Sequence, residues 1–164
     1  MKKVIVGIGE ILWDMLPSGK SLGGAPANFA YHSAYLGAEA WAVSAIGDDP
    51  LGHEILDVLK TKKLHALLAM SSRPTGIVQV ELNASGVPTY NIMENVAWDN
   101  IPFTPEMEAL AARTDAVCFG SLVQRMNSRD SVRKFIEATP TSALKVFDIN
   151  LRQHYYCQDV IEAS

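Results

Sequence analysis

Two polar segments of the chain carry residue types that suit contact with hydroxyl or phosphoryl oxygens. The first is Gly23-Gly24-Ala25-Pro26-Ala27-Asn28, where two glycines lead into a segment that Pro26 can begin as a helix. Glycines let the backbone approach a ligand closely, and the bare amides of a helix start favour polar or anionic groups. Asn28 falls in the first turn and offers both a donor and an acceptor. The segment therefore predicts a site for polar oxygens.

The second segment follows an apolar run near the end of the sequence. Asp148, Asn150 and Arg152 alternate there, so their side chains can share one side of the chain. In open α/β sheets ligands lie beyond the carboxyl ends of strands, and an amide with a guanidinium suits phosphate or sugar oxygens. Asp148 could instead bond to neighbouring backbone, and this alternative stays open. Gly120-Ser121-Leu122, which also follows a strand, is a weaker candidate for the same edge.

Asp14 is a third candidate, because it stands between Trp13 and Met15 in an extended apolar segment. Such an Asp is either an exposed edge charge or a polar contact, and a carboxylate can accept two hydroxyl bonds at once. The first segment also has simpler readings. The two glycines could form only a turn, and Asn28 could be a solvated helix residue.

The elements that position these residues alternate between short β-branched runs and longer helical periods, which predicts a mainly parallel sheet flanked by helices. The expected strands are apolar enough to be buried on both faces; they cover residues 3–9, 40–46, 64–69, 116–119 and 145–149. The expected helices cover residues 26–36, 51–61, 105–112 and 128–138.

Residues 11–22 and 73–100 do not fit this alternation and predict a separate element. Gly76–Leu82 alternates apolar with polar residues, Asn83–Gly86 supplies turn residues, and residues 87–93 resume an extended pattern, which indicates a hairpin with one solvated face. Residues 11–16 could pair with this hairpin. The result would be a small sheet that projects from the main layer and covers part of the molecule.

Composition limits the class of protein. A chain of 164 residues with 48% hydrophobic residues suits one globular domain, and the net charge of -4 argues against nucleic acid as a partner. No apolar run is long enough for a signal peptide or a membrane span, which favours the cytoplasm and no membrane partner. Cys118 and Cys157 give neither a disulfide framework nor zinc spacing, and the scattered histidines give no metal site.

A nucleotide fingerprint is a further reading of the N-terminus, where Gly7-Ile8-Gly9-Glu10 follows a strand. The third glycine is missing and no helix follows at once, so Rossmann cofactor binding is not favoured.

The stretch from Gly23 to Gly47, taken with Gly9-Glu10 and with Asp148-Ile149-Asn150-Leu151-Arg152, resembles the ribokinase-like (PfkB) carbohydrate kinases, and fructokinases look most similar. The resemblance implies a ribokinase-like α/β domain with a small β-clasp lid. It implies ATP-dependent phosphorylation of a sugar hydroxyl, with fructose the favoured acceptor and Mg²⁺ bridging the phosphates. It also implies a homodimer formed through the clasp.

The resemblance gives roles to individual residues. Those matching the sugar contacts of the family are Asp14, Gly23, Gly24 and Asn28, and those matching the phosphoryl path are Asp148, Asn150 and Arg152. Trp98 is expected to pack over an apolar face of the sugar, and the alternative is a core aromatic at the hinge of the lid.

The family's general base lies in a Gly-Ala-Gly-Asp-like motif of its C-terminal half, and this sequence has no such motif. Residues 159–164 look like the opening of a helix without an end signal. We therefore expect residues 1–164 to be the N-terminal part of one ribokinase-like domain, inactive alone and without a catalytic or metal-binding residue. Two alternatives remain: a kinase for 2-keto-3-deoxygluconate, ribose or a nucleoside, and a non-catalytic sugar-binding or dimerisation module.

Overall fold

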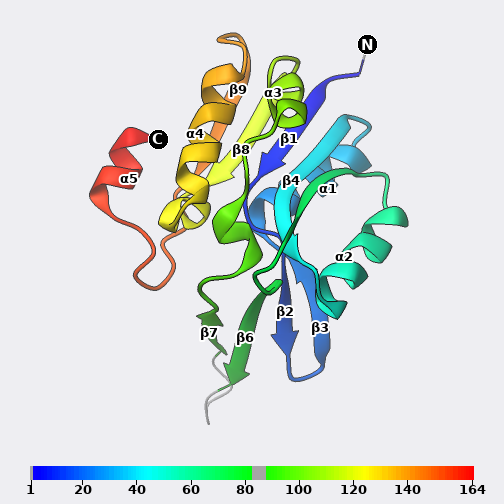
Figure 1. The fold of residues 1–164 in the computed structure, drawn as a ribbon, viewed down its shortest axis with the longest axis vertical. Coiled ribbons are helices and arrows are strands. Elements are labelled where there is room, and N and C mark those ends of the chain that lie inside the picture. The colour runs from blue at the N-terminus through cyan, green and yellow to red at the C-terminus, as the bar shows by residue number, and fades with distance from the viewer. Residues whose placement is uncertain (1, 83–87) are drawn as a thin grey trace.

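The computed structural model describes residues 2–82 and 88–164 and contains a five-stranded, wholly parallel main sheet (Figure 1). In spatial order its strands are β5 (His65–Ser71), β4 (Glu39–Gly47), β1 (Val4–Ile8), β8 (Ala116–Gly120) and β9 (Leu144–Asp148). These are the five predicted strands, with ends that differ by one or two residues. The predicted α/β class is confirmed.

The four predicted helices are also present: α1 (Ala25–Tyr35), α2 (Pro50–Lys60), α3 (Pro105–Ala111) and α4 (Ser128–Ala138). Local capping explains two starts, because Asp49 accepts from the Gly52 amide (2.8 Å) and Thr104 accepts from the Met107 amide (3.3 Å). The pattern had not indicated two short 3-10 turns, η1 (Ala97–Asn100) and η2 (Leu122–Arg125). A last helix, α5 (Gln158–Ala163), forms where the sequence suggested a helix start.

The core around the main sheet has two parts, one on each face, and a third cluster lies under the projecting sheet. Side chains of β1 and β8 pack with those of α3 and α4 on one face, where Val6, Val117 and Phe135 are buried. On the other face α1 and α2 contribute Ala30, Ile55 and Leu59 to a cluster with β4. The strands are apolar because most of them have a helix layer on each side.

The outer strands differ from the expectation of burial on both faces. Most side chains of β5 and β9 are half-buried or exposed, whereas those of β1, β4 and β8 are mostly buried. The prediction is wrong for β5 and β9 because each pairs with one neighbour only, among the described residues.

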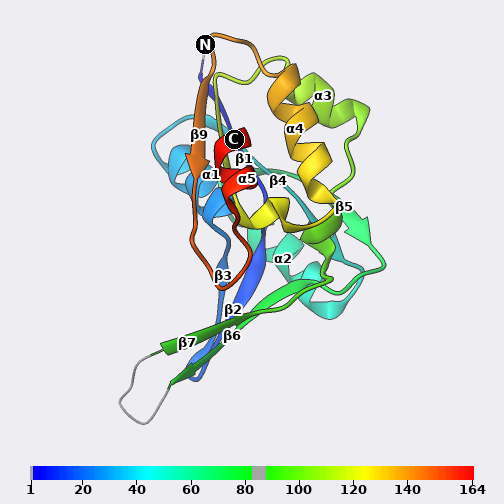
Figure 2. The ribbon, with the colours of Figure 1, turned by 90° about the vertical axis from the view of Figure 1, so that its left-hand side faces the viewer.

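A second sheet of four strands projects from the main body (Figure 2). Its spatial order is β3 (Gly19–Gly23), β2 (Leu12–Leu16), β6 (Gly76–Leu82) and β7 (Pro88–Ile92), with β2 and β6 parallel and the outer pairs antiparallel. This is the separate element predicted from residues 11–22 and 73–100. The predicted turn at Asn83–Gly86 lies outside the described residues. We call these four strands the projecting sheet.

The projecting sheet is fixed to the main body at its base. Trp13 Nε1 donates to the carbonyl of Leu51 at the start of α2 (3.0 Å), and the Thr75 hydroxyl donates to Asp49 (2.7 Å). β1 continues through Gly9 into β2, so no helix follows β1 directly. A dinucleotide-binding turn therefore does not form there.

None of the described helices is long and apolar enough to cross a membrane. Cys118 is buried and Cys157 is exposed, and both are free thiols.

Candidate functional site

A cleft of about 550 Å³ lies between the projecting sheet and the carboxyl-terminal edge of the main sheet. It brings together six of the predicted site residues from opposite ends of the sequence: Asp14, Gly24, Asn28, Asp148, Asn150 and Arg152. The cleft is where β2, the start of α1 and the end of β9 meet. The two polar segments of the sequence thus form one site.

The start of α1 forms one wall of the cleft. Gly24 has a φ of 112°, and a Cβ there would collide with the carbonyl oxygen of Glu10, so this position requires glycine. Pro26 lies in the first turn, and the Asn28 amide donates to the Gly24 carbonyl (2.9 Å). The exposed Asn28 carboxamide is left with both a donor and an acceptor for a ligand.

Asp14 lies on β2, directly across from Ser21 of β3. Its side chain is half-buried, and burial raises the pKa of its carboxyl, against the opposing charge of Arg152. A Cβ at position 23 would collide with Asp14 Oδ2. Gly23 therefore makes room for the carboxylate, and it is Asp14 rather than Gly23 that lines the cleft.

The end of β9 forms the opposite wall. Asp148 Oδ1 accepts a hydrogen bond from the Asn150 backbone amide (3.1 Å). The alternative considered from the sequence, a bond to neighbouring backbone, is therefore present. The Asp148 carboxyl also lines the cleft. Asn150 has a φ of 35°, a conformation that Asn tolerates better than most residues. The buried Ser121 hydroxyl donates to the carbonyls of Ile149 and Asn150, which fixes this segment. The Arg152 guanidinium lies 5.3 Å from the ring centre of Tyr90.

Trp98, like Gly23, is a predicted contact that does not line the cleft. Its side chain is 0% exposed in η1 and packs against Gly76 and the Arg125 guanidinium, which lies 4.1 Å from the ring centre. This burial matches the alternative reading, a core aromatic at the base of the projecting sheet. Contact with a sugar would require the whole base to open.

The sequence reasoning missed Glu10 as a site residue. This side chain is 2% exposed, lines the cleft, and has one oxygen, Oε2, without a hydrogen-bond partner among the described residues. Burial raises the pKa of its carboxyl from 4.5 to about 7, while hydrogen bonds from the amides of Glu10 and Ala25 lower it. A charged residue directly after the apolar run of β1 was the available signal.

The apolar wall of the cleft was also missed, because its residues look like ordinary strand positions. Projecting-sheet side chains facing the cleft include Leu12, Val78, Val80 and Ile92, all buried. The projecting sheet therefore adds apolar side chains beside the Asp14 carboxylate, while the start of α1 and the end of β9 add amides, a carboxylate and a guanidinium. A polyol fits such a site, since its C–H faces and its hydroxyl groups need opposite environments.

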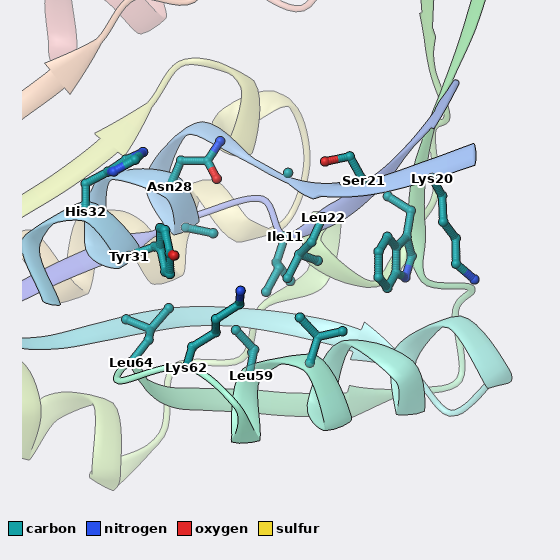
Figure 3. A pocket seen from close by; sticks show the side chains of 14 residues that line it. Ile11, Lys20, Ser21, Leu22, Asn28, Tyr31, His32, Leu59, Lys62 and Leu64 are labelled. Atoms are coloured by element: carbon teal, nitrogen blue, oxygen red, sulfur yellow. The ribbon is translucent and has the colours of Figure 1, made fainter. Parts of the chain in front are cut away.

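A second cavity, of about 560 Å³, lies between α1, α2 and the projecting sheet (Figure 3). Its lining mixes polar and apolar side chains, and its lysines already have partners within the chain. Lys20 pairs with Glu54 and lies 5.0 Å from the Trp13 ring centre, and Lys62 lies 5.4 Å from that of Tyr31. Ser21 of β3 and Asn28 of α1 line both cavities, so these two residues lie between the two.

In the part of the chain that the structure describes, no three side chains of His, Cys, Asp or Glu are grouped to hold a metal ion.

Comparison with known proteins gives one family match. A family model described as pfkB family carbohydrate kinase matches residues 18–163. A Pyrococcus horikoshii protein named as a sugar kinase is 30% identical over 163 residues, covering 91% of this chain and 52% of that protein. A fructokinase of Solanum tuberosum is 31% identical over 166 residues, with 91% and 52% covered. The chain thus spans about half the length of these curated relatives.

Solved structures agree with the fold. The crystal structure of the uncharacterized Pyrococcus horikoshii sugar kinase PH1459 superposes with a TM-score of 0.83 at 28% identity, covering 98% of this chain and 57% of that one. A structure of the same kinase in complex with ATP gives a TM-score of 0.79 at 29% identity, with 96% and 57% covered. A fructokinase of Halothermothrix orenii, at 22% identity and a TM-score of 0.82, shares the fold, with 98% and 64% covered.

Proposed function

Because this chain belongs to the pfkB family of carbohydrate kinases, we propose that it supplies the sugar-binding half and the lid of an ATP-dependent sugar kinase. The observation that carries the proposal is the cleft, where Asp14, Asn28 and Arg152 meet from three separate elements. Hydrogen-bonding groups and apolar side chains that line the same cleft can together orient a polyol. The projecting sheet would be the lid.

Fructose is the acceptor that we propose, giving a fructose phosphate. Two features support it: the similarity to a named fructokinase at 31% identity, and a cleft whose polar wall suits neutral hydroxyl groups. Asp14 would accept bonds from two hydroxyls, and Asn28 would both donate and accept.

In the reaction, the bond between the γ-phosphorus of ATP and its bridging oxygen breaks, and a bond to the sugar oxygen forms. A general base accepts the proton of the sugar hydroxyl. The family resemblance assigns this base to a Gly-Ala-Gly-Asp-like motif, which this sequence lacks. ATP supplies the phosphoryl group, with Mg²⁺ neutralising its phosphates. We therefore propose that the 164-residue chain binds sugar but does not turn over ATP.

Two residues of this chain fit the phosphoryl group by their chemistry. Arg152 offers a fork of N–H donors, and the Asn150 carboxamide offers two more, at the end of β9. They would bind and orient the equatorial oxygens while Asp14 and Asn28 hold the acceptor. Closure of the lid would exclude water, whose attack would otherwise hydrolyse ATP.

A second candidate substrate follows from Arg152. Its exposed guanidinium in the cleft could pair with the carboxylate of a sugar acid such as 2-keto-3-deoxygluconate. The variant Arg152→Gln separates the two candidates. It should weaken sugar-acid binding far more than fructose binding if the guanidinium meets a carboxylate of the sugar.

We also propose that the lid forms the contact of a homodimer. Leu16 and Tyr90 on the projecting sheet are 40% and 42% exposed, so a second copy could cover apolar surface there. The same surface could close over the sugar instead. Light scattering with and without fructose distinguishes these, because only the first gives a dimer mass.

Calorimetry with a panel of sugars on the 164-residue chain tests the binding half of the proposal. Fructose should bind, and Asp14→Ala should weaken it. ADP release by the full-length natural protein tests the kinase half. Fructose binding without ADP release in that protein would favour a non-catalytic binding module, and absence of binding to every sugar tested would reject the proposal.

A further inference from the structure

The second cavity, between α1, α2 and the projecting sheet, has a lining that the proposed sugar chemistry does not use. Its volume of about 560 Å³ is enough for a small ligand. The described residues that line it include Lys20, Lys62 and His32, but no Asp or Glu. The chain as a whole has a net charge of -4, so the cavity is a local reversal of charge.

The sugar cleft has the opposite balance of charged side chains. It is lined by three carboxyl groups and one guanidinium, those of Glu10, Asp14, Asp148 and Arg152. Opposite charges attract a ligand to one site and keep it from the other. The second cavity is therefore the better site for a small anion.

The two lysines of the second cavity keep charge that an anion can use. Figure 3 shows Lys62 reaching from the α2 side toward Tyr31 of α1, and its ammonium lies 5.4 Å from the Tyr31 ring centre. A ring has no net charge, and Lys62 forms no ion pair within the described part of the chain, so its charge is not neutralised. Lys20 pairs with Glu54, but these side chains are 31% and 43% exposed. Such an open pair adds little stability and is easily exchanged for another anion.

Apolar side chains form much of the remaining wall. Ile11, Leu59 and Leu64 are buried there, and Leu22 and Val58 are half-buried. A wall of this kind favours the carbon body of an organic ligand, whereas a bare inorganic ion would lose its water without compensation.

We propose that the second cavity binds a small organic anion, with a carboxylate or phosphate head near Lys62 and Lys20 and an apolar body against the buried side chains. Ser21 and Asn28 line both cavities, so the two sites share a wall. An Asn28 carboxamide that turns its donors toward the anion turns them away from the sugar.

The anion should therefore weaken sugar binding, and by reciprocity the sugar should weaken anion binding by the same factor. This coupling rests on the proposed sugar-binding function, whereas the anion site itself does not.

Phenyl phosphate and benzoate are suitable probes, because each joins an anionic head to a small apolar body. Phenol has the same body without the charge and is their control. By calorimetry on the 164-residue chain, at least one of the two anions should bind with a Kd of about 1 mM or tighter, and phenol about tenfold more weakly. No binding of either anion up to about 20 mM, or equal binding of phenol, overturns the proposal.

Two variants place the anion in the cavity. Lys62→Met keeps the apolar stem and removes the charge, so anion affinity should fall about fivefold or more. Val58→Phe fills the cavity and should weaken the anion without a change of charge. Lys60→Met is the matched control, because Lys60 on α2 pairs with Asp57 and does not line the cavity; it should change anion affinity by less than about twofold.

The variant Arg152→Gln tests the other location for the anion. Anion binding that is lost in this variant and kept in Lys62→Met belongs to the cleft and overturns the proposal. Light scattering tests a second copy of the chain as the occupant. A dimer that Val58→Phe dissociates would show that the partner fills the cavity, which also overturns it.

Fructose titrations with and without the anion test the coupling. Fructose affinity should fall about threefold or more with the anion in the wild type, and by less in Lys62→Met at the same anion concentration. Unchanged fructose affinity overturns the coupling. Lys62-dependent anion binding in a chain that binds no sugar supports the anion site and rejects the proposed function instead.

Discussion

Gly23 leaves the space that the carboxylate of Asp14 occupies, because a Cβ at position 23 would collide with Asp14 Oδ2. The two residues lie on neighbouring antiparallel strands, β3 and β2. The first glycine of the pair is thus needed for the room that it leaves to a side chain, and the second, Gly24, for its backbone conformation and its close approach to the Glu10 carbonyl. The diglycine serves the cleft in two physically different ways.

Gly23→Ala should therefore act through Asp14. We expect sugar affinity to fall about tenfold, because a displaced carboxylate loses its charge-assisted bonds. Calorimetry on a double-mutant cycle checks this. In the Asp14→Ala background the Gly23→Ala change should have little further effect, and an equal effect in both backgrounds would show that the two residues act independently.

Asp14→Ala should raise the sugar KM of the full-length natural protein by about tenfold or more, since a pair of charge-assisted hydrogen bonds is lost. Steady-state kinetics at saturating ATP measures the change. Asp57→Asn is the matched control, because Asp57 is an exposed carboxyl on α2 that pairs with Lys60, far from the cleft. An unchanged sugar KM in Asp14→Ala would remove Asp14 from the site.

The Glu10 carboxyl should make the stability of the chain depend on pH. Burial raises its pKa in the folded chain from 4.5 to about 7. Between pH 4.5 and about pH 7 the folded chain keeps a proton on this carboxyl that the unfolded chain has released. The free energy of unfolding therefore falls as the pH rises across this range, by about 3 kcal/mol.

Urea unfolding at pH 5 and pH 8 checks this prediction. Other carboxyls, such as Asp115, have lowered pKa values and act in the opposite direction. The comparison is therefore between wild type and Glu10→Gln, which does not titrate. The wild type should lose more stability than the variant on going to pH 8, and parallel behaviour of the two would contradict the prediction.

A buried ion pair holds the base of the projecting sheet. Arg125 donates to Asp99 from Nε (2.7 Å) and Nη2 (2.9 Å), and their side chains are 4% and 0% exposed. Arg125→Met would leave Asp99 as a buried carboxylate without its cation. We expect the free energy of unfolding to fall by about 3–5 kcal/mol.

Chemical denaturation measures this loss, with Arg133→Met as the control. Arg133 forms exposed pairs with Asp130 and Glu137 on α4, and such pairs contribute only about 0.5 kcal/mol. Similar losses in the two variants would mean that the Arg125–Asp99 pair adds little to stability.

Elements of the main sheet could be predicted because their signals are local. The apolar runs of β1, β4 and β8 reflect a helix layer on each face, and Thr104 before Pro105 marks a helix start within a few residues. Exposure of β5 and β9 could not be predicted in this way. Strand order decides which strands lie at an edge, and order depends on contacts far apart in the sequence.

For the site, the sequence by itself determined which residue types are present to bind oxygens: the diglycine, Asn28, Asp14 and the Asp148–Arg152 run. Tertiary structure alone decided their neighbours. It buried Glu10 beneath the start of α1, placed Trp98 in the core, and put Arg152 near Tyr90. The physical reason is that desolvation and close contact depend on segments that meet only in the folded chain, whereas helix starts and strand periods depend on adjacent residues.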